Sequence, residues 1–232
     1  MSRFSVTVFT SIGKKIFMAL TGLVLSGFIV VHLIGNIALL YPDKDPFNKY
    51  AYFLASLGVL LYIAEFILAS VFLVHFFYAV VITIGNWWAR PSRYRVNRNA
   101  GHTSKKTIAS TTMVYTGILI ITFTVLHLLH FKFGEIAMYT TKDGLYIRDL
   151  YTIVYQFFSD IWNVSFYMAI MILLGFHVSH GFWSAFQSLG IHGVWFTRFV
   201  HGFGYLFAVI MGTGFLFLPI YIFLTSSYGG KL

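Results

Sequence analysis

Five stretches of this sequence are apolar for long enough to cross a lipid bilayer as helices. A membrane-spanning helix needs about 20 predominantly apolar residues, and the stretches run over about residues 15–40, 54–86, 108–131, 161–187 and 199–224. Only 10% of the residues are charged and 58% are hydrophobic, unlike a soluble domain. We therefore predict an all-α membrane protein with one transmembrane domain over residues 1–232.

The distribution of charge predicts the orientation of the chain. Loops that stay in the cytoplasm carry an excess of Lys and Arg. With the N-terminus inside, ten of the sixteen Lys and Arg residues fall on the cytoplasmic side and six of the seven acidic residues fall outside. We expect a multi-pass protein of the cytoplasmic (inner) membrane, with its C-terminus outside and no removable signal peptide. The basic run from Arg90 to Lys106 is a short loop between spans, so nucleic-acid binding is not expected.

The chain contains no cysteine. It cannot ligate an iron–sulfur cluster or attach a c-type haem through thioether bonds. If the chain moves electrons, it needs histidine-bound haem, a quinone, and partner subunits that carry other redox centres.

Histidines are unusually frequent inside the predicted spans. A lone intramembrane histidine often makes only a hydrogen bond to a neighbouring helix. At least one on each of four successive helices is instead typical of a bundle that holds cofactors in its core. The histidines in the first four spans are His32, His75, His127, His130, His177 and His180.

Depth sorts four of these histidines into two pairs. At 1.5 Å rise per residue, His32 and His127 lie ~25 and ~28 Å from the cytoplasmic rim, near the outer face. His75 and His177 lie ~14 and ~15 Å from the same rim. This arithmetic predicts that helices 1–4 form a bundle around two stacked b-type haems, with the iron atoms ligated axially by His32 and His127 (outer haem) and by His75 and His177 (inner haem).

Three further polar residues in the spans have candidate roles. His130 is one turn beyond His127 and is the alternative third-helix ligand. His180 either contacts a haem propionate or a quinone, or makes a hydrogen bond to a neighbouring helix. Glu65, the only acidic residue inside a span, either exchanges protons with a quinone or is a structural hydrogen-bonding group.

Four segments carry a resemblance to a known family: "VVHLIGNI", "LVHFFYAV", "VLHLLHF" and "GFHVSHGFWSAFQSLG", one on each of the first four spans. With five spans, the chain resembles over nearly its whole length the dihaem cytochrome b membrane anchor of succinate:quinone oxidoreductase, the b558-type subunit of succinate dehydrogenase and fumarate reductase (complex II). The family's four axial haem ligands fall on His32, His75, His127 and His177.

This resemblance implies a function. Members of the family bind a flavoprotein with covalent FAD and an iron–sulfur subunit on the cytoplasmic side, where succinate is oxidised in the tricarboxylic acid cycle. Electrons then pass through the inner and outer haems to menaquinone or another quinone. The chain itself would do no dicarboxylate chemistry. Its loop Arg90–Lys106, with "SAFQSLGIHG", is the expected docking surface for the iron–sulfur subunit.

Two alternatives remain open. The chain could be the cytochrome b anchor of another membrane oxidoreductase, of the hydrogenase or formate dehydrogenase type. It could also be a haem-free membrane transporter, in which the intramembrane histidines form a proton path.

Overall fold

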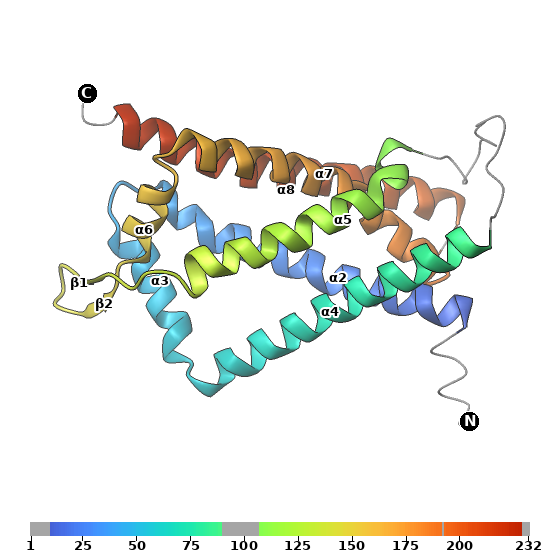
Figure 1. Ribbon diagram of the computed structural model, residues 1–232, viewed down its shortest axis with the longest axis horizontal. Helices are drawn as coiled ribbons and strands as arrows, with labels where there is room; N and C mark the ends of the chain where they lie inside the picture. Colours follow the sequence, from blue (N-terminus) through green and yellow to red (C-terminus); the bar gives the residue numbers. More distant parts are fainter. Residues whose placement is uncertain (1–9, 90–106, 192, 229–232) are drawn as a thin grey trace.

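The computed structural model describes residues 10–89, 107–191 and 193–228, and most of them are helical (Figure 1). In chain order the elements are α2 (Ser11–Asn36), η1 (Ile37–Leu40), α3 (Asp45–Ser56), α4 (Val59–Trp88), α5 (Ile108–His127), η3 (Leu128–Lys132), β1 (Met138–Thr140), β2 (Tyr146–Arg148), α6 (Leu150–Phe157), α7 (Ile161–Ser188) and α8 (Val194–Tyr228).

The five expected membrane spans are confirmed. Helices long and apolar enough to cross a membrane cover Ser11–Leu40, Val59–Trp88, Ile108–Lys132, Ile161–Ser188 and Val194–Ser226. The chain is thus a multi-pass membrane protein by the length and composition of its helices.

The second span begins later than the expected residue 54. Residues up to Ser56 belong to the separate helix α3, and Gly58 has a φ of 56°. Only glycine adopts this left-handed conformation without strain, so the chain turns sharply here before α4 starts at Val59.

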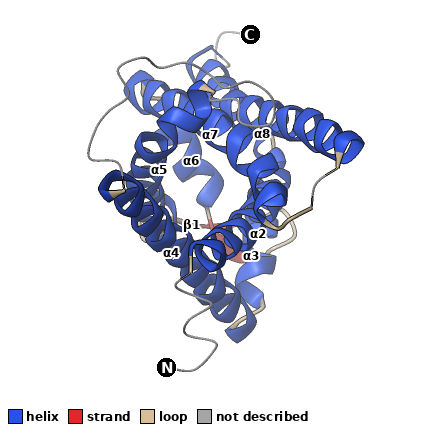
Figure 2. Cartoon of the chain, turned by 90° about the vertical axis from the view of Figure 1, so that its right-hand side faces the viewer, coloured by secondary structure: helices blue, strands red, loops and turns tan. Residues whose placement is uncertain are grey.

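Helices α2, α4, α5 and α7 surround a common axis, and α8 lies outside against α7 and α2 (Figure 2). A close approach of glycines joins α7 to α8. A methyl group added to Gly212 would lie 3.5 Å from the Cα of Gly175. Small residues of this kind let membrane helices pack backbone to backbone. By contrast, α4 meets α5 only marginally.

We call the end of the bundle that carries α3, the β1–β2 hairpin and α6 the hairpin end. The antiparallel strands of this small hairpin were not expected from the sequence. Asn48 on α3 is fully buried there and joins two of the elements at this end. Its side-chain amide donates to Asp149 Oδ1 at 2.9 Å, and its Oδ1 accepts from the backbone N–H of Tyr151 at 2.8 Å. Asn48 thus ties α3 to the first turn of α6.

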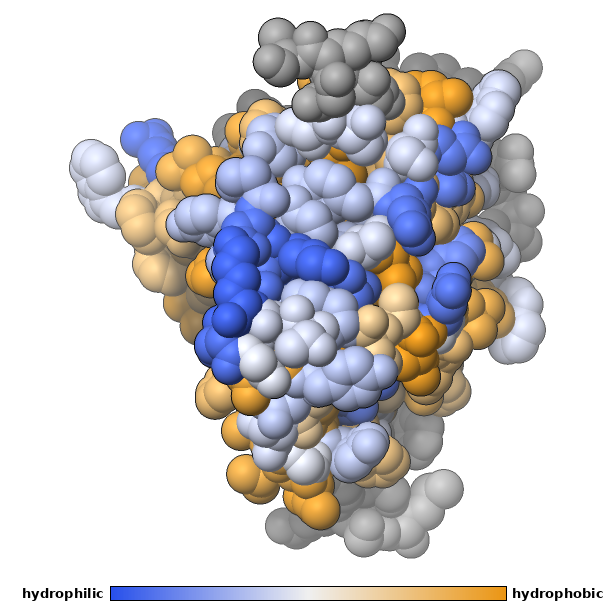
Figure 3. Space-filling model, turned by 90° about the vertical axis from the view of Figure 1, so that its left-hand side faces the viewer, coloured by the Kyte–Doolittle hydropathy of each residue, from blue (hydrophilic) through white to orange (hydrophobic). Residues whose placement is uncertain are grey.

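Lys44, Lys49 and Lys142 at the hairpin end are ion-paired with carboxylates, and this end presents a hydrophilic surface (Figure 3). Hydrogen bonds from Lys49 and Thr141 hold the pKa of Asp143 at about 2. Burial would raise the pKa of Asp149, but hydrogen bonds from Lys44 and Asn48 outweigh it and lower that pKa. The lysines at this end are therefore neutralised locally.

We expect Asn48→Ala to lower the free energy of unfolding by about 2 kcal/mol, because Asp149 Oδ1 and the Tyr151 N–H would lose a buried partner. Unfolding in mixed micelles, followed by circular dichroism, measures this loss. Ser159→Ala is the control, since Ser159 is exposed and bonds only a carbonyl of its own turn. Equal effects of the two changes would contradict the role given to Asn48.

Candidate cofactor site

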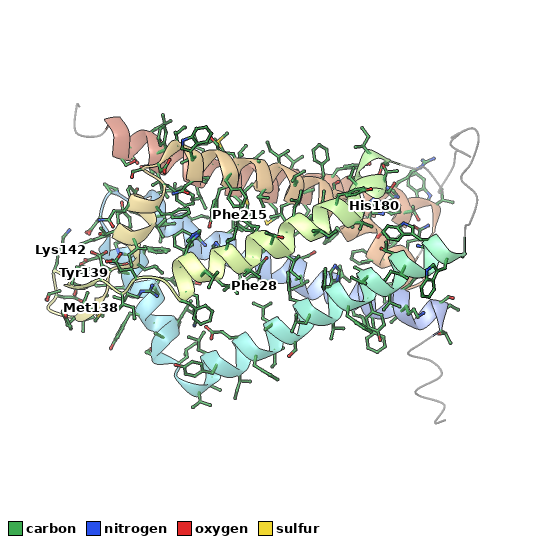
Figure 4. All side chains as sticks on the ribbon, viewed as in Figure 1. Phe28, Met138, Tyr139, Lys142, His180 and Phe215 are labelled. Atoms are coloured by element: carbon green, nitrogen blue, oxygen red, sulfur yellow. The ribbon has the colours of Figure 1, made fainter. Side chains whose placement is uncertain are left out.

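The structure brings His32 and His127 together inside the bundle. His32 lies on α2 and His127 is the last residue of α5, and their ring centroids are 5.8 Å apart with planes at 82°. Aromatic rings surround the pair. Phe28 stacks on His32 at 5.3 Å, and Phe215 of α8 lies 5.9 Å from the same ring. Figure 4 labels both phenylalanines.

His75 and His177, the second pair predicted from the sequence, lie nearer the end opposite the hairpin end. Each is hydrogen-bonded to a threonine of a neighbouring helix. Thr21 Oγ1 on α2 is 3.0 Å from His75 Nδ1, and Thr116 Oγ1 on α5 is 3.0 Å from His177 Nδ1.

The two pairs lie at different levels for a reason of helix geometry. Thr21 precedes His32 by eleven residues, and Thr116 precedes His127 by eleven residues. Eleven residues are about three helical turns and rise about 16 Å. Thr21 and His32 therefore share one face of α2, and Thr116 and His127 share one face of α5. Because the threonines hold His75 and His177, the second pair lies about 16 Å along the bundle from the first.

A glycine follows each of these threonines and faces the same imidazole. A methyl group on Gly22 would lie 3.2 Å from His75 Cε1, and one on Gly117 would lie 3.7 Å from His177 Cε1. The helix backbone thus leaves room for the histidine ring on the helix face that carries the hydroxyl.

His130 points elsewhere. Residues Leu128–Lys132 form a π-helical turn, which winds less per residue than the α-helix before it. The His130 ring packs 4.7 Å from Phe157 of α6 and is exposed, whereas His127 faces His32. This geometry favours His127 over His130 as the partner of His32.

His180 lies farther from the hairpin end than Phe28 and Phe215 do (Figure 4). Its Nδ1 is buried with no hydrogen-bond partner among the described residues. The ring meets Trp183 edge-on at 5.1 Å, and Trp183 stacks on His201 of α8 at 4.0 Å. His180 therefore has a polar atom free for a ligand, as contact with a haem propionate or with a quinone requires.

Glu65 near the start of α4 is bonded to Lys132 of η3, and both side chains are about two-fifths exposed: 38% and 39%. This ion pair joins α4 to the end of α5, where these helices otherwise have little contact. Glu65 is thus held by Lys132, which lies five residues beyond His127 in the chain.

Sequence reasoning missed Thr21 and Thr116. A signal was present: "TGLVLSGFIVVH" and "TGILIITFTVLH" repeat Thr-Gly, nine residues and His on the first and third spans. No sequence pattern predicted the stacking of His201 on Trp183, because the two residues lie on different helices. The basic loop Arg90–Lys106 lies outside the described residues.

The donor set limits what the site can bind. The described residues contain no group of three or more His, Cys, Asp or Glu side chains arranged for a metal ion, and the histidines come in twos. A metal held by two imidazoles among apolar rings needs its other positions filled by a non-protein ligand, as a porphyrin fills them in bis-histidine haem. The residues present fit that group.

Comparison with protein-family models, with curated proteins and with solved structures finds no match to this chain.

We expect Gly22→Ala to displace the His75 ring, because the new methyl group would lie 3.2 Å from Cε1. The ¹⁵N chemical shifts of the His75 imidazole in histidine-labelled protein should change. Gly27→Ala on the same helix is the matched control, since a methyl group there meets nothing within 4 Å. Unchanged His75 shifts in Gly22→Ala would show that the ring is not held against this glycine.

Proposed function

We propose that this chain is a dihaem cytochrome b, the membrane anchor that passes electrons between the iron–sulfur subunit of succinate dehydrogenase (complex II) and a quinone. The observation that carries the proposal is that histidines from four successive spans lie inside the bundle at two levels, with the His32 and His127 rings 5.8 Å apart. His32 and His127 would hold the outer haem, and His75 and His177 the inner one.

The spacing of the first pair supports this assignment. Two imidazoles bound to opposite sides of one metal ion at about 2 Å per bond have ring centroids about 6 Å apart. The observed separation of the His32 and His127 centroids is 5.8 Å. For the second pair, the support is the bonding of both Nδ1 atoms to threonine, which leaves Nε2 as the free nitrogen of each ring.

Bound haem supplies reversible one-electron chemistry, which no side chain of this protein can supply. The chain's own residues position that chemistry. Helix α2 contributes His32 to one level and Thr21 to the other, so it fixes their spacing. The rings of Phe28, Phe215 and Phe123 exclude water around the outer pair. The free Nδ1 of His180 is a candidate donor or acceptor for a propionate or a quinone oxygen.

Partner subunits would dock on the end opposite the hairpin end. At the hairpin end, lysines are paired with carboxylates. The described basic residues at the opposite end are Lys14, Lys15 and Arg198, and none of the described ion pairs involves them. With the sequence run Arg90–Lys106 that joins α4 to α5, these residues support placing the opposite end in the cytoplasm. There a flavoprotein with FAD and an iron–sulfur subunit would complete the enzyme.

The test is the reduced-minus-oxidised optical spectrum and the low-temperature EPR spectrum of the purified complex and its single histidine variants. We expect two low-spin b-type signals in the wild type. His75→Ala and His177→Ala should disturb one signal, and His32→Ala and His127→Ala the other, because each pair shares one iron. His130→Ala and His180→Ala are the controls and should keep both signals.

Several outcomes would redirect the proposal. Absence of b-type bands would leave the haem-free transporter. Loss of the same signal in the His32 and His75 variants would overturn the pairing. Co-purification of a nickel or molybdenum enzyme, in place of a flavoprotein and an iron–sulfur subunit, would indicate the anchor of a hydrogenase or formate dehydrogenase.

For Glu65 we propose proton exchange with a quinone near the outer haem. Glu65→Gln keeps the size of the side chain and removes its ionisable proton, so it should slow quinone turnover while both haems stay bound. Lys132→Met removes the same ion pair but keeps the carboxyl group. If the two variants turn over quinone equally slowly, Glu65 acts only through the ion pair and is structural.

A further inference from the structure

We propose that Thr21 and Thr116 are positioning residues that fix the tautomer of His75 and His177, so that Nε2 of each ring is the metal-binding atom. The two threonines also lower the reduction potential of the centre that these histidines share. The part of this inference that concerns potential rests on the function proposed above. The part that concerns the tautomer does not.

The hydrogen-bond inventory at Thr21 decides the direction of its bond to His75. A hydroxyl has one proton to donate and can also accept. The Thr21 hydroxyl donates to the backbone carbonyl of Phe17 at 2.7 Å, with the Met18 carbonyl at 3.1 Å. With its proton used in the bond to Phe17, the hydroxyl meets His75 Nδ1 at 3.0 Å as an acceptor, so Nδ1 carries the proton and donates to Thr21 Oγ1.

Thr116 repeats this arrangement in the second half of the bundle. Its hydroxyl lies 3.1 Å from the carbonyls of Thr112 and Met113, and 3.0 Å from His177 Nδ1. Both threonines are buried, at 8% and 3% exposure, so water does not compete for these bonds. The same device thus acts on both histidines of the pair.

A fixed Nδ1 proton has two consequences. A neutral imidazole carries one N–H, so its lone pair for a metal lies on Nε2. Donation from Nδ1 to an oxygen also makes the ligating nitrogen more basic. A more basic ligand stabilises the oxidised metal over the reduced one, so these bonds lower the reduction potential.

The other pair is surrounded differently. His32 stacks on Phe28, and His127 has only Tyr167 Oη near its Nδ1, at the long distance of 3.4 Å. The effect of the threonines should therefore appear at one centre and not at the other. This difference gives every measurement an internal reference.

The first experiment is a potentiometric titration of the purified complex with Thr21→Val and Thr116→Val. Valine keeps the shape of threonine and removes the accepting oxygen. We expect each change to raise the midpoint potential of the same low-spin centre, the one disturbed in the His75 variant. Thr21→Ser and Thr116→Ser, which keep the hydroxyl, should restore the wild-type potential. Thr122→Val is the matched control, because Thr122 is an exposed residue of α5 bonded only to Ile118.

The second experiment needs no cofactor. In ¹⁵N-histidine-labelled haem-free protein, NMR should find His75 and His177 protonated on Nδ1. Each valine variant should move its own histidine to the Nε2-protonated form, and each serine variant should not.

The outcomes separate this inference from the proposed function. Haem bound with unchanged potentials in both valine variants would overturn the effect on potential. Nε2-protonated His75 and His177 in the wild type would overturn the tautomer assignment, whether or not haem binds. Absence of haem with Nδ1-protonated rings would remove the proposed function and keep the assignment. If a valine variant does not fold, the wild-type NMR spectrum and the serine variants still decide.

Discussion

An imidazole inside an apolar bundle must be hydrogen-bonded or bound to a ligand, and this constraint governs how the first four spans fit together. Two hydrogen bonds that satisfy it cross between helices: Thr21 to His75 joins α2 to α4, and Thr116 to His177 joins α5 to α7. A ring contact between His32 and His127 joins α2 to α5. These contacts fix the register of four helices whose apolar faces alone would slide past one another easily.

The bundle is built from two similar halves. In each half, a helix with the Thr-Gly and His spacing is followed by a short cap helix, α3 or α6, and then by a helix whose histidine returns to the threonine. The halves are alike in their histidines, but the two levels differ in surroundings. One level has hydroxyl acceptors and the other has aromatic rings. Hydrogen bonds and burial are the means by which a protein gives different properties to centres with the same axial ligands.

The cap at the hairpin end shows where prediction from the sequence stopped. The apolar residues from Leu54 to Leu57 look like the start of a span, but they belong to the end of α3 and its turn. What separates α3 from α4 is the backbone conformation of Gly58, which hydropathy does not encode. Asn48 gave no signal either, because its importance comes from Asp149 and Tyr151, about a hundred residues away in the chain.

The sequence by itself determined five membrane-spanning helices, and it predicted by depth the grouping of His32 with His127 and of His75 with His177. It could do so because apolar length and rise per residue are properties of each helix alone. The tertiary structure decided which hydroxyl meets which imidazole, and that His127 faces His32 while His130 turns to Phe157. Those choices depend on how each helix is rotated about its axis, and only packing between helices sets that rotation.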